Sequence, residues 1–222
     1  MLNNRTMQEG AELKGRILAA RERLAAQQMQ IKEHRIPVLV LMEGWGTAGK
    51  GRIIGQVIRN IDPRFFNVVS LEKTTEEEMR KPFLSRYFTK IPEAGKFLFL
   101  DSGWMEDVTG LYLHKELGTE AYEVRIESIR RFERQLTDNG YLVVKFFFHI
   151  GKKEQRKRIN SLLEDIDTEW RVSDSDQWQN RHYEECMEVY SHYLQKTKAP
   201  SAPWYVVDAE KKKWAELPVL EA

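Results

Sequence analysis

One segment constrains the fold more than any other: an apolar run, a glycine-rich turn and a helical pattern, in that order. Residues 37–42 read PVLVLM, and residues 44–51 read GWGTAGKG. An apolar run bounded by proline and glycine is typical of a parallel strand buried on both faces. After the turn, apolar residues recur at helical spacing: Ile53, Ile54, Val57, Ile58 and Ile61. The segment therefore predicts a strand–turn–helix unit of an α/β fold.

The turn itself has the P-loop spacing G-x-x-x-x-G-K, which ends here at Lys50. Its glycines let backbone N–H groups turn toward phosphate oxygens, the helix N-terminus favours an anion, and the lysine adds a positive charge. The spacing predicts a phosphate site made by Gly44, Gly46, Thr47, Ala48, Gly49, Lys50, Gly51 and Arg52. The alternative is a tight glycine turn with a solvated lysine. Gly51 stands where a P-loop normally has a serine or threonine for the metal.

The rest of the chain alternates between strand and helix patterns, which predicts a parallel sheet of about five strands flanked by helices. Further strands are expected at residues 66–71, 96–101, 141–150 and 204–208. Helices are expected at residues 11–33, 76–89, 122–138, 152–164 and 177–195. Residues 105–119 show no clear pattern, and we expect a helical lid within about residues 105–138.

We expect three parts: an N-terminal helical extension over residues 1–35 that packs on the core, a P-loop kinase-like domain over residues 36–215, and a C-terminal tail over residues 216–222. The 35 basic and 34 acidic side chains nearly cancel, which argues against a general nucleic-acid binder. No apolar run is long enough for a membrane span, and no signal peptide is apparent. The single cysteine, Cys186, excludes an internal disulfide and is typical of a reducing compartment, so we expect a cytoplasmic protein.

An acidic residue, Asp101, ends the apolar strand at residues 96–101. In P-loop proteins, a carboxylate at this place holds Mg²⁺ directly or through water. The chain thus offers Asp101 as its candidate metal ligand and Lys50 as its candidate catalytic cation. The alternative for Asp101 is a cap on the segment that follows.

Several further motifs, in the same order along the chain, resemble the polyphosphate kinase 2 family. They include EGWGTAGKG at residues 43–51, PFLSRYF at residues 82–88, WRVSDSD at residues 170–176 and APW at residues 202–204. The resemblance covers roughly residues 20 to 215. It implies a P-loop kinase fold with a helical lid, transfer of phosphate between inorganic polyphosphate and AMP, ADP or ATP with Mg²⁺, and a homodimer or homotetramer.

Two departures from the family pattern fall at chemically important positions. The resemblance implies an aspartate where this chain has Gly46, and an arginine where it has Ser102. An arginine that neutralises phosphoryl charge is worth roughly a thousandfold in related reactions. The two losses predict weak turnover, with binding less affected.

Basic residues near two expected helices are candidates for holding the polyphosphate chain, because a polyanion needs a row of cations. Arg130 and Arg134 lie at helical spacing in the expected lid, and Lys152 and Lys153 begin the helix after residue 150. Arg158 matches a family position and is a candidate catalytic residue. The alternative is a solvated surface with local salt bridges.

Three functions fit these features. The first is an active polyphosphate-dependent phosphotransferase, with activity weakened by Gly46 and Ser102. The second is a non-catalytic module for polyphosphate or nucleotide binding or for dimerisation, resembling the degenerate N-terminal copy of a tandem polyphosphate:AMP phosphotransferase. The third, an ATP-dependent nucleoside monophosphate kinase, fits the P-loop but not the later motifs.

Overall fold

The computed structural model describes residues 2–71 and 74–222. Its centre is a sheet of five parallel strands in the order β2-β3-β1-β4-β5. The strands are β1 (Val38–Gly44), β2 (Phe66–Val69), β3 (Phe97–Asp101), β4 (Leu142–His149) and β5 (Trp204–Asp208). The predicted five-strand parallel sheet is confirmed. The middle strand β1 pairs with β3 on one side and with β4 on the other, so its residues from Val38 to Met42 are buried.

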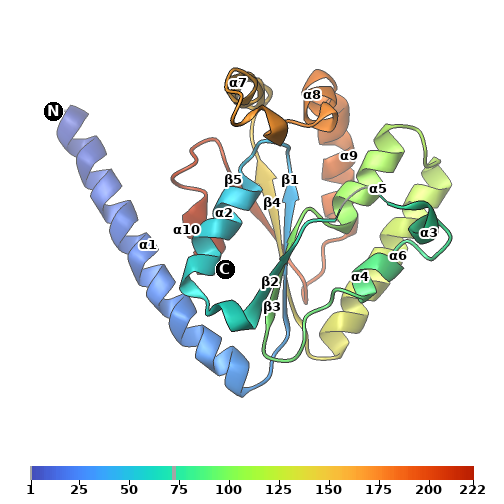
Figure 1. Ribbon diagram of the computed structural model, residues 1–222, viewed down its shortest axis with the longest axis horizontal. Coiled ribbons are helices and arrows are strands. Elements are labelled where there is room, and N and C mark those ends of the chain that lie inside the picture. Colours follow the sequence, from blue (N-terminus) through green and yellow to red (C-terminus); the bar gives the residue numbers. More distant parts are fainter. Residues whose placement is uncertain (1, 72–73) are drawn as a thin grey trace.

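Helices cover both faces of the sheet (Figure 1). On one side lie α1 (Leu2–Glu33), α2 (Lys50–Val57) and α10 (Glu216–Glu221); on the other lie α5 (Trp104–Leu113), α6 (Thr119–Asp138) and α9 (Tyr183–Lys196). Two more helices, α7 (Lys152–Leu163) and α8 (Asp174–Arg181), stand above the carboxyl ends of β1 and β4. Short helical turns complete the fold: α3 (Glu76–Met79), α4 (Ser85–Phe88), η1 (Ile58–Asn60), η2 (Pro63–Phe65) and η3 (Glu169–Arg171).

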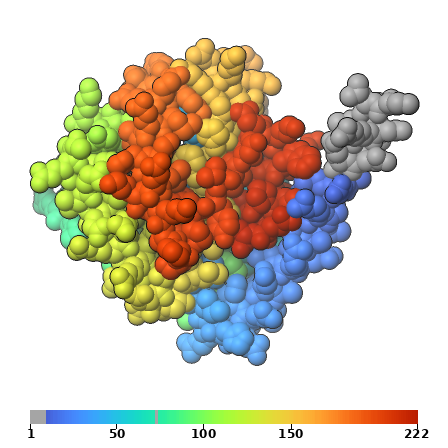
Figure 2. Space-filling view, turned by 180° about the vertical axis from the view of Figure 1, so that it is seen from behind, coloured from blue at the N-terminus to red at the C-terminus, as the bar shows by residue number. Residues whose placement is uncertain are grey.

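The C-terminal residues pack against helix α1. Residues 216–221, expected as a tail, form helix α10, whose Leu217 and Val219 are buried. Arg21 of α1 pairs with Glu216 of α10 at 2.5 Å. Figure 2 shows the C-terminal residues lying against the side of α1.

Two expected helices are interrupted in the structure. The pattern at residues 76–89 forms the one-turn helices α3 and α4, because Pro82 has no N–H and disfavours helical geometry in the residue before it. The pattern at residues 177–195 is split between α8 and α9 at His182, whose φ and ψ of −105° and 33° leave the helical region.

The segment without a clear pattern, residues 105–119, is mostly regular. Helix α5 occupies residues 104–113 and buries Trp104, Met105, Val108, Thr109 and Leu113. Helix α6 likewise buries one face, including Ile126 and Phe132. Both helices pack as core layers in this conformation, whereas the segment that borders the P-loop is α7 to α8. Among the described residues, no helix has the length and apolar character needed to cross a membrane.

Candidate active site

The predicted P-loop connects β1 to α2 at the carboxyl edge of the sheet. Gly44 has a φ of 117° and lies so close to the backbone of Phe148 that a side chain would not fit there. Gly49, with a φ of 98°, immediately precedes the first turn of α2. The first N–H groups of a helix have no partner within the helix, so this turn presents donors to an anion. The ammonium of Lys50 folds back to donate to the Gly44 carbonyl at 3.1 Å.

Asp101 reaches this loop because β3 is the neighbour of β1, with Asp101 paired in register to Met42. Its Oδ2 would lie 3.1 Å from a Cβ at Gly51, so the carboxylate occupies space that a side chain at residue 51 would reach. Burial raises the pKa of Asp101, Lys50 opposes the rise, and Glu106 adds to it. The arrangement places a hard oxygen ligand beside Lys50 at the start of α2.

These residues line one cleft of about 830 Å³, together with residues from the segment after α7. The cleft contains the whole predicted phosphate site and also Ser102. Four cations face it, namely Lys50, Arg52, Arg171 and Lys212. Three carboxylates face it as well, namely Asp101, Glu106 and Asp176.

Helices α7 and α8 clamp the first half of the P-loop. The Gly46 N–H donates to Gln179 Oε1 at 2.8 Å, and Gln155 Nε2 donates to the Gly46 carbonyl at 3.3 Å. Gln155 also donates to Gln179 at 2.7 Å, and Gln179 donates to the Tyr190 hydroxyl at 2.6 Å. The conformation of the loop therefore depends on side chains far along the sequence.

Arg158 is part of this clamp and does not line the cleft. Its guanidinium donates to the Ala48 carbonyl at 3.1 Å, to the Ala209 carbonyl at 2.7 Å and to the Glu154 carboxylate at 2.7 Å. The side chain is only 4% exposed. In this structure its donors are engaged by protein oxygens, as expected of a residue that positions the loop. The catalytic role of Arg158 stays a prediction.

A buried carboxyl that the sequence analysis did not single out lies directly before the loop. Glu43 Oε1 accepts the N–H groups of Gly103 at 3.0 Å and Met105 at 3.2 Å, tying the end of β1 to the turn after Asp101. Burial, strengthened by Glu106, raises the pKa of Glu43 to about 8. In the sequence, the signal for Glu43 is an acidic residue at the end of an otherwise apolar strand.

The residues present suit a divalent cation. Asp101 offers a carboxylate, the ligand type that Mg²⁺ prefers, and Thr47 Oγ1 is buried with no hydrogen-bond partner among the described residues. Within the described part of the chain, however, no group of three or more His, Cys, Asp or Glu side chains could hold a metal on its own. Such a site would be completed by phosphate oxygens and water, as is usual for Mg²⁺ beside phosphates.

Comparison with known proteins identifies the family of this chain. The family model described as Polyphosphate kinase 2 matches residues 7–222. The chain belongs to the polyphosphate kinase 2 family. Its sequence is 30% identical to an ADP-polyphosphate phosphotransferase of Rhodopseudomonas palustris, covering 88% of this chain and 72% of that protein. It is 29% identical to a polyphosphate:AMP phosphotransferase of Pseudomonas aeruginosa, covering 91% of this chain but only 41% of that protein.

Solved polyphosphate kinase 2 structures have the same fold. The structure from Arthrobacter aurescens superposes with a TM-score of 0.90 at 31% identity, covering 95% of this chain and 76% of that one. A structure titled a putative polyphosphate kinase 2 from Pseudomonas aeruginosa gives a TM-score of 0.88 at 27% identity, covering 94% of this chain and 45% of that one.

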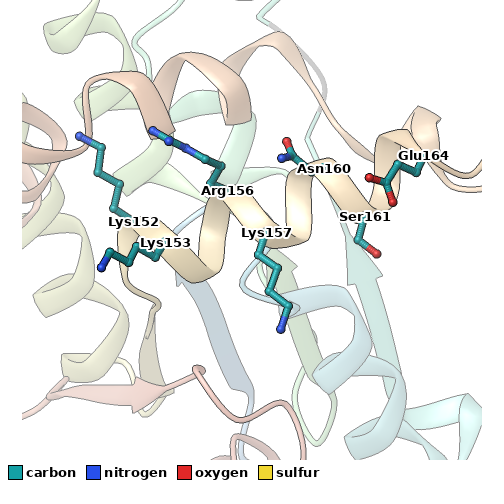
Figure 3. A pocket seen from close by; sticks show the side chains of 7 residues that line it. All are labelled: Lys152, Lys153, Arg156, Lys157, Asn160, Ser161 and Glu164. Carbon is teal, nitrogen blue, oxygen red and sulfur yellow. The ribbon is translucent and has the colours of Figure 1, made fainter.

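In this family member, the predicted polyphosphate residues fall into two separate places. Lys152 and Lys153 lie on α7 and line an open groove of about 690 Å³ with Arg156, Lys157, Asn160, Ser161 and Glu164 (Figure 3). Lys152 also pairs with Glu184 at 2.9 Å. The groove is a local concentration of positive charge beside the P-loop clamp.

Arg130 and Arg134 are not brought together with that groove or with the P-loop. Both are exposed on α6, where Arg130 pairs with Glu127 at 2.9 Å and Arg134 with Asp138 at 3.4 Å. Helix α6 ends just before β4 begins, so its last turns lie at the amino edge of the sheet, whereas the P-loop lies at the carboxyl edge. Their contact with polyphosphate stays a prediction that this placement does not support.

Proposed function

We propose that this chain is a phosphotransferase module that moves phosphoryl groups between inorganic polyphosphate and AMP or ADP, using Mg²⁺. One observation carries the proposal: Lys50 of the P-loop and Asp101 of the neighbouring strand line a single cleft in a polyphosphate kinase 2 chain. The curated relatives are named as AMP and ADP phosphotransferases, which supports the choice of substrates.

Each group has a separate task in this reaction. The N–H groups of the P-loop and the Lys50 ammonium bind the phosphate oxygens and fix the reacting phosphoryl group in the cleft. Asp101 holds Mg²⁺. When bound, the metal ion neutralises charge on the phosphoryl oxygens. Arg158 keeps the loop in shape through the Ala48 carbonyl.

A direct assay tests the proposal. The purified chain is incubated with polyphosphate, Mg²⁺ and either AMP or ADP, and new ADP or ATP is measured. We expect the wild type to turn over. Lys50→Met or Asp101→Asn should reduce the rate by about 100-fold or more, which is the usual effect of removing a group that stabilises charge in the transition state. Asp138→Asn, an exposed carboxylate on α6, is the matched control and should leave the rate unchanged.

A second candidate function is a non-catalytic polyphosphate-binding, nucleotide-binding or dimerisation domain, of the kind expected from a degenerate copy in a tandem polyphosphate:AMP phosphotransferase. Ser102 stands where the family resemblance implies an arginine, and Gly46 gives the loop no carboxylate of its own. The chain spans 41% of the Pseudomonas aeruginosa relative, which is compatible with this alternative. Binding of polyphosphate without turnover, and no gain in turnover with Ser102→Arg, would favour it.

We further propose that the protein works as a homo-oligomer, a dimer or a tetramer, as the family resemblance implies. Light scattering on the purified chain gives the mass directly. A monomer at assay concentration would exclude this part of the proposal without affecting the reaction.

A further inference from the structure

Asp176, on the first turn of α8, uses only one of its two carboxylate oxygens for the helix cap. Its Oδ2 accepts the Ser173 N–H and the Ser173 hydroxyl, both at 2.8 Å. These bonds form a capping box that fixes the side chain. The other oxygen, Oδ1, points away from the cap toward the P-loop.

Oδ1 occupies the space that a side chain at residue 46 would take. A Cβ atom at residue 46 would overlap Asp176 Oδ1, would lie 2.8 Å from Asp176 Cγ and would lie 3.3 Å from Gln179 Oε1. The missing side chain of the P-loop is therefore filled by a carboxylate from another element. The bond from the Gly46 N–H to Gln179, one turn along α8, holds the two segments at this distance.

The helix cap does not explain why a negative charge lies beside a loop that binds phosphate. A phosphate bound by the P-loop would be repelled by Asp176, which lines the same cleft. A divalent cation between the two anions reverses the sign of the interaction, and Mg²⁺ is bound through one or two carboxylates together with phosphate oxygens. Asp101, on the strand beside the loop, also lines the cleft, and its Oδ2 lies 3.1 Å from the position of a Cβ atom at Gly51.

We propose that Asp176 supplies from α8 the carboxylate that the P-loop lacks, and that it holds the phosphate-bound Mg²⁺ together with Asp101. This inference rests on the proposed function, since it assigns a residue to that same site. One consequence is structural: the metal site is complete only when α8 rests on the P-loop, because its second ligand is carried by α8 and not by the loop.

Binding of tripolyphosphate to the full chain, measured by calorimetry with and without Mg²⁺, tests the inference independently of activity. The variant Asp176→Asn keeps an oxygen for the Ser173 cap and removes the negative charge. In EDTA it should bind tripolyphosphate as tightly as the wild type or more tightly, because a repulsion is gone. With Mg²⁺ it should bind about 10-fold or more weakly, the usual cost of losing a group that holds a metal. Asp174→Asn, two residues earlier on α8, is the matched control and should match the wild type in both conditions.

A merely structural role predicts a different result, namely an equal loss of affinity with and without Mg²⁺. That result, or an unchanged Mg²⁺ effect in Asp176→Asn, overturns the inference and leaves the proposed function standing. If the wild type binds no tripolyphosphate in either condition, the proposed function fails and the inference fails with it.

Relocating the carboxylate gives a second, positive test. Asp176→Ala removes both the charge and the obstruction, and it should lose the Mg²⁺ effect. Adding Gly46→Asp to that variant puts a carboxylate on the P-loop itself and should restore at least part of the effect. Gly46→Asp in the presence of Asp176 should instead weaken binding, because the two side chains compete for one space. No recovery in the double variant would overturn the inference.

Discussion

The guanidinium of Arg158 holds the P-loop by donating to the carbonyl of Ala48 at 3.1 Å, although the two residues are 110 positions apart. The same side chain bonds the carbonyls of Ala209 and Glu210, at 2.7 and 3.0 Å. The loop that is expected to bind phosphate is thus tied to α7 and to the turn after β5. A short glycine-rich loop gains a fixed conformation from this arrangement, before any ligand arrives.

Replacing Arg158 with alanine should destabilise the fold and weaken phosphate binding at once. The carbonyls of Ala48 and Ala209 would lose a charged donor, and hydrogen bonds to charged groups are worth about 1.5–3 kcal/mol each. Urea unfolding gives the free energy, and calorimetry gives the affinity for tripolyphosphate. The exposed Arg131, paired with Glu127, supplies the control Arg131→Ala, for which we expect less than about 1 kcal/mol. If Arg158→Ala keeps its stability but loses affinity for tripolyphosphate, Arg158 contacts the ligand directly.

The sheet and the P-loop could be predicted from the sequence because their signals are local. The run at residues 37–42 is apolar throughout, and the glycines that shape the loop follow it directly. Residues 76–89 have helical spacing, but Pro82 lies inside this stretch and divides it into two one-turn helices. The bounds of α5 could not be predicted within the expected helical segment, because this helix buries five residues and shows no clean polar face.

The contacts that complete the site could not be predicted, because they join distant segments. Gln179 and Gly46 are 133 positions apart, and neither residue indicates the other. Arg130 and Arg134 show the limit of charge patterns. Both lie on a helix as their spacing predicts, but α6 runs toward the amino edge of the sheet, away from the P-loop. The spacing of cations along a sequence does not show which part of the fold they reach until the topology is known.

A buried ion pair supports the layer beneath the site. Lys145 Nζ lies 2.6 Å from Glu133 Oε2 and donates to the Thr197 carbonyl at 2.9 Å. Replacing Lys145 with methionine should cost about 3–5 kcal/mol near neutral pH. Because burial raises the pKa of Glu133, the isolated carboxyl should take up a proton, so the loss measured by urea unfolding should shrink as the pH falls.

The double variant Lys145→Met with Glu133→Met is the informative companion, since it leaves no buried charge. It should recover most of the lost stability. Lys81→Met, in the exposed pair with Glu77, is the control and should leave the free energy of unfolding nearly unchanged. A double variant as unstable as the single one would show that packing, and not the unpaired carboxyl, causes the loss.

Glu43 should make stability depend on pH. The unfolded glutamate titrates near 4.5, whereas burial raises the pKa of folded Glu43 to about 8. Between these values the folded chain keeps a proton that the unfolded chain releases. The free energy of unfolding should therefore fall as the pH rises, with a slope from Glu43 of up to about 1.4 kcal/mol per pH unit. Urea unfolding between about pH 5 and about pH 8 measures the slope.

Glu43→Gln isolates this effect, because glutamine still offers an oxygen to the N–H groups of Gly103 and Met105. Its unfolding free energy should be flatter over the same pH range than that of the wild type. Parallel profiles would mean that folded Glu43 titrates near its ordinary pKa.

The basic groove on α7 should recognise long polyphosphate, whereas the arginines of α6 should not. Reversing two charges with Lys153→Glu and Lys157→Glu should weaken binding of long-chain polyphosphate about tenfold or more at low salt. Tripolyphosphate should lose less, because it is too short to occupy the P-loop and the whole groove. The matched control, Arg130→Glu with Arg134→Glu, changes the net charge equally at exposed sites. Added salt should shrink the effect, since exposed charges are screened within about 10 Å at 0.1 M. A greater loss in the α6 variant would contradict the assignment and place the polyphosphate chain along α6.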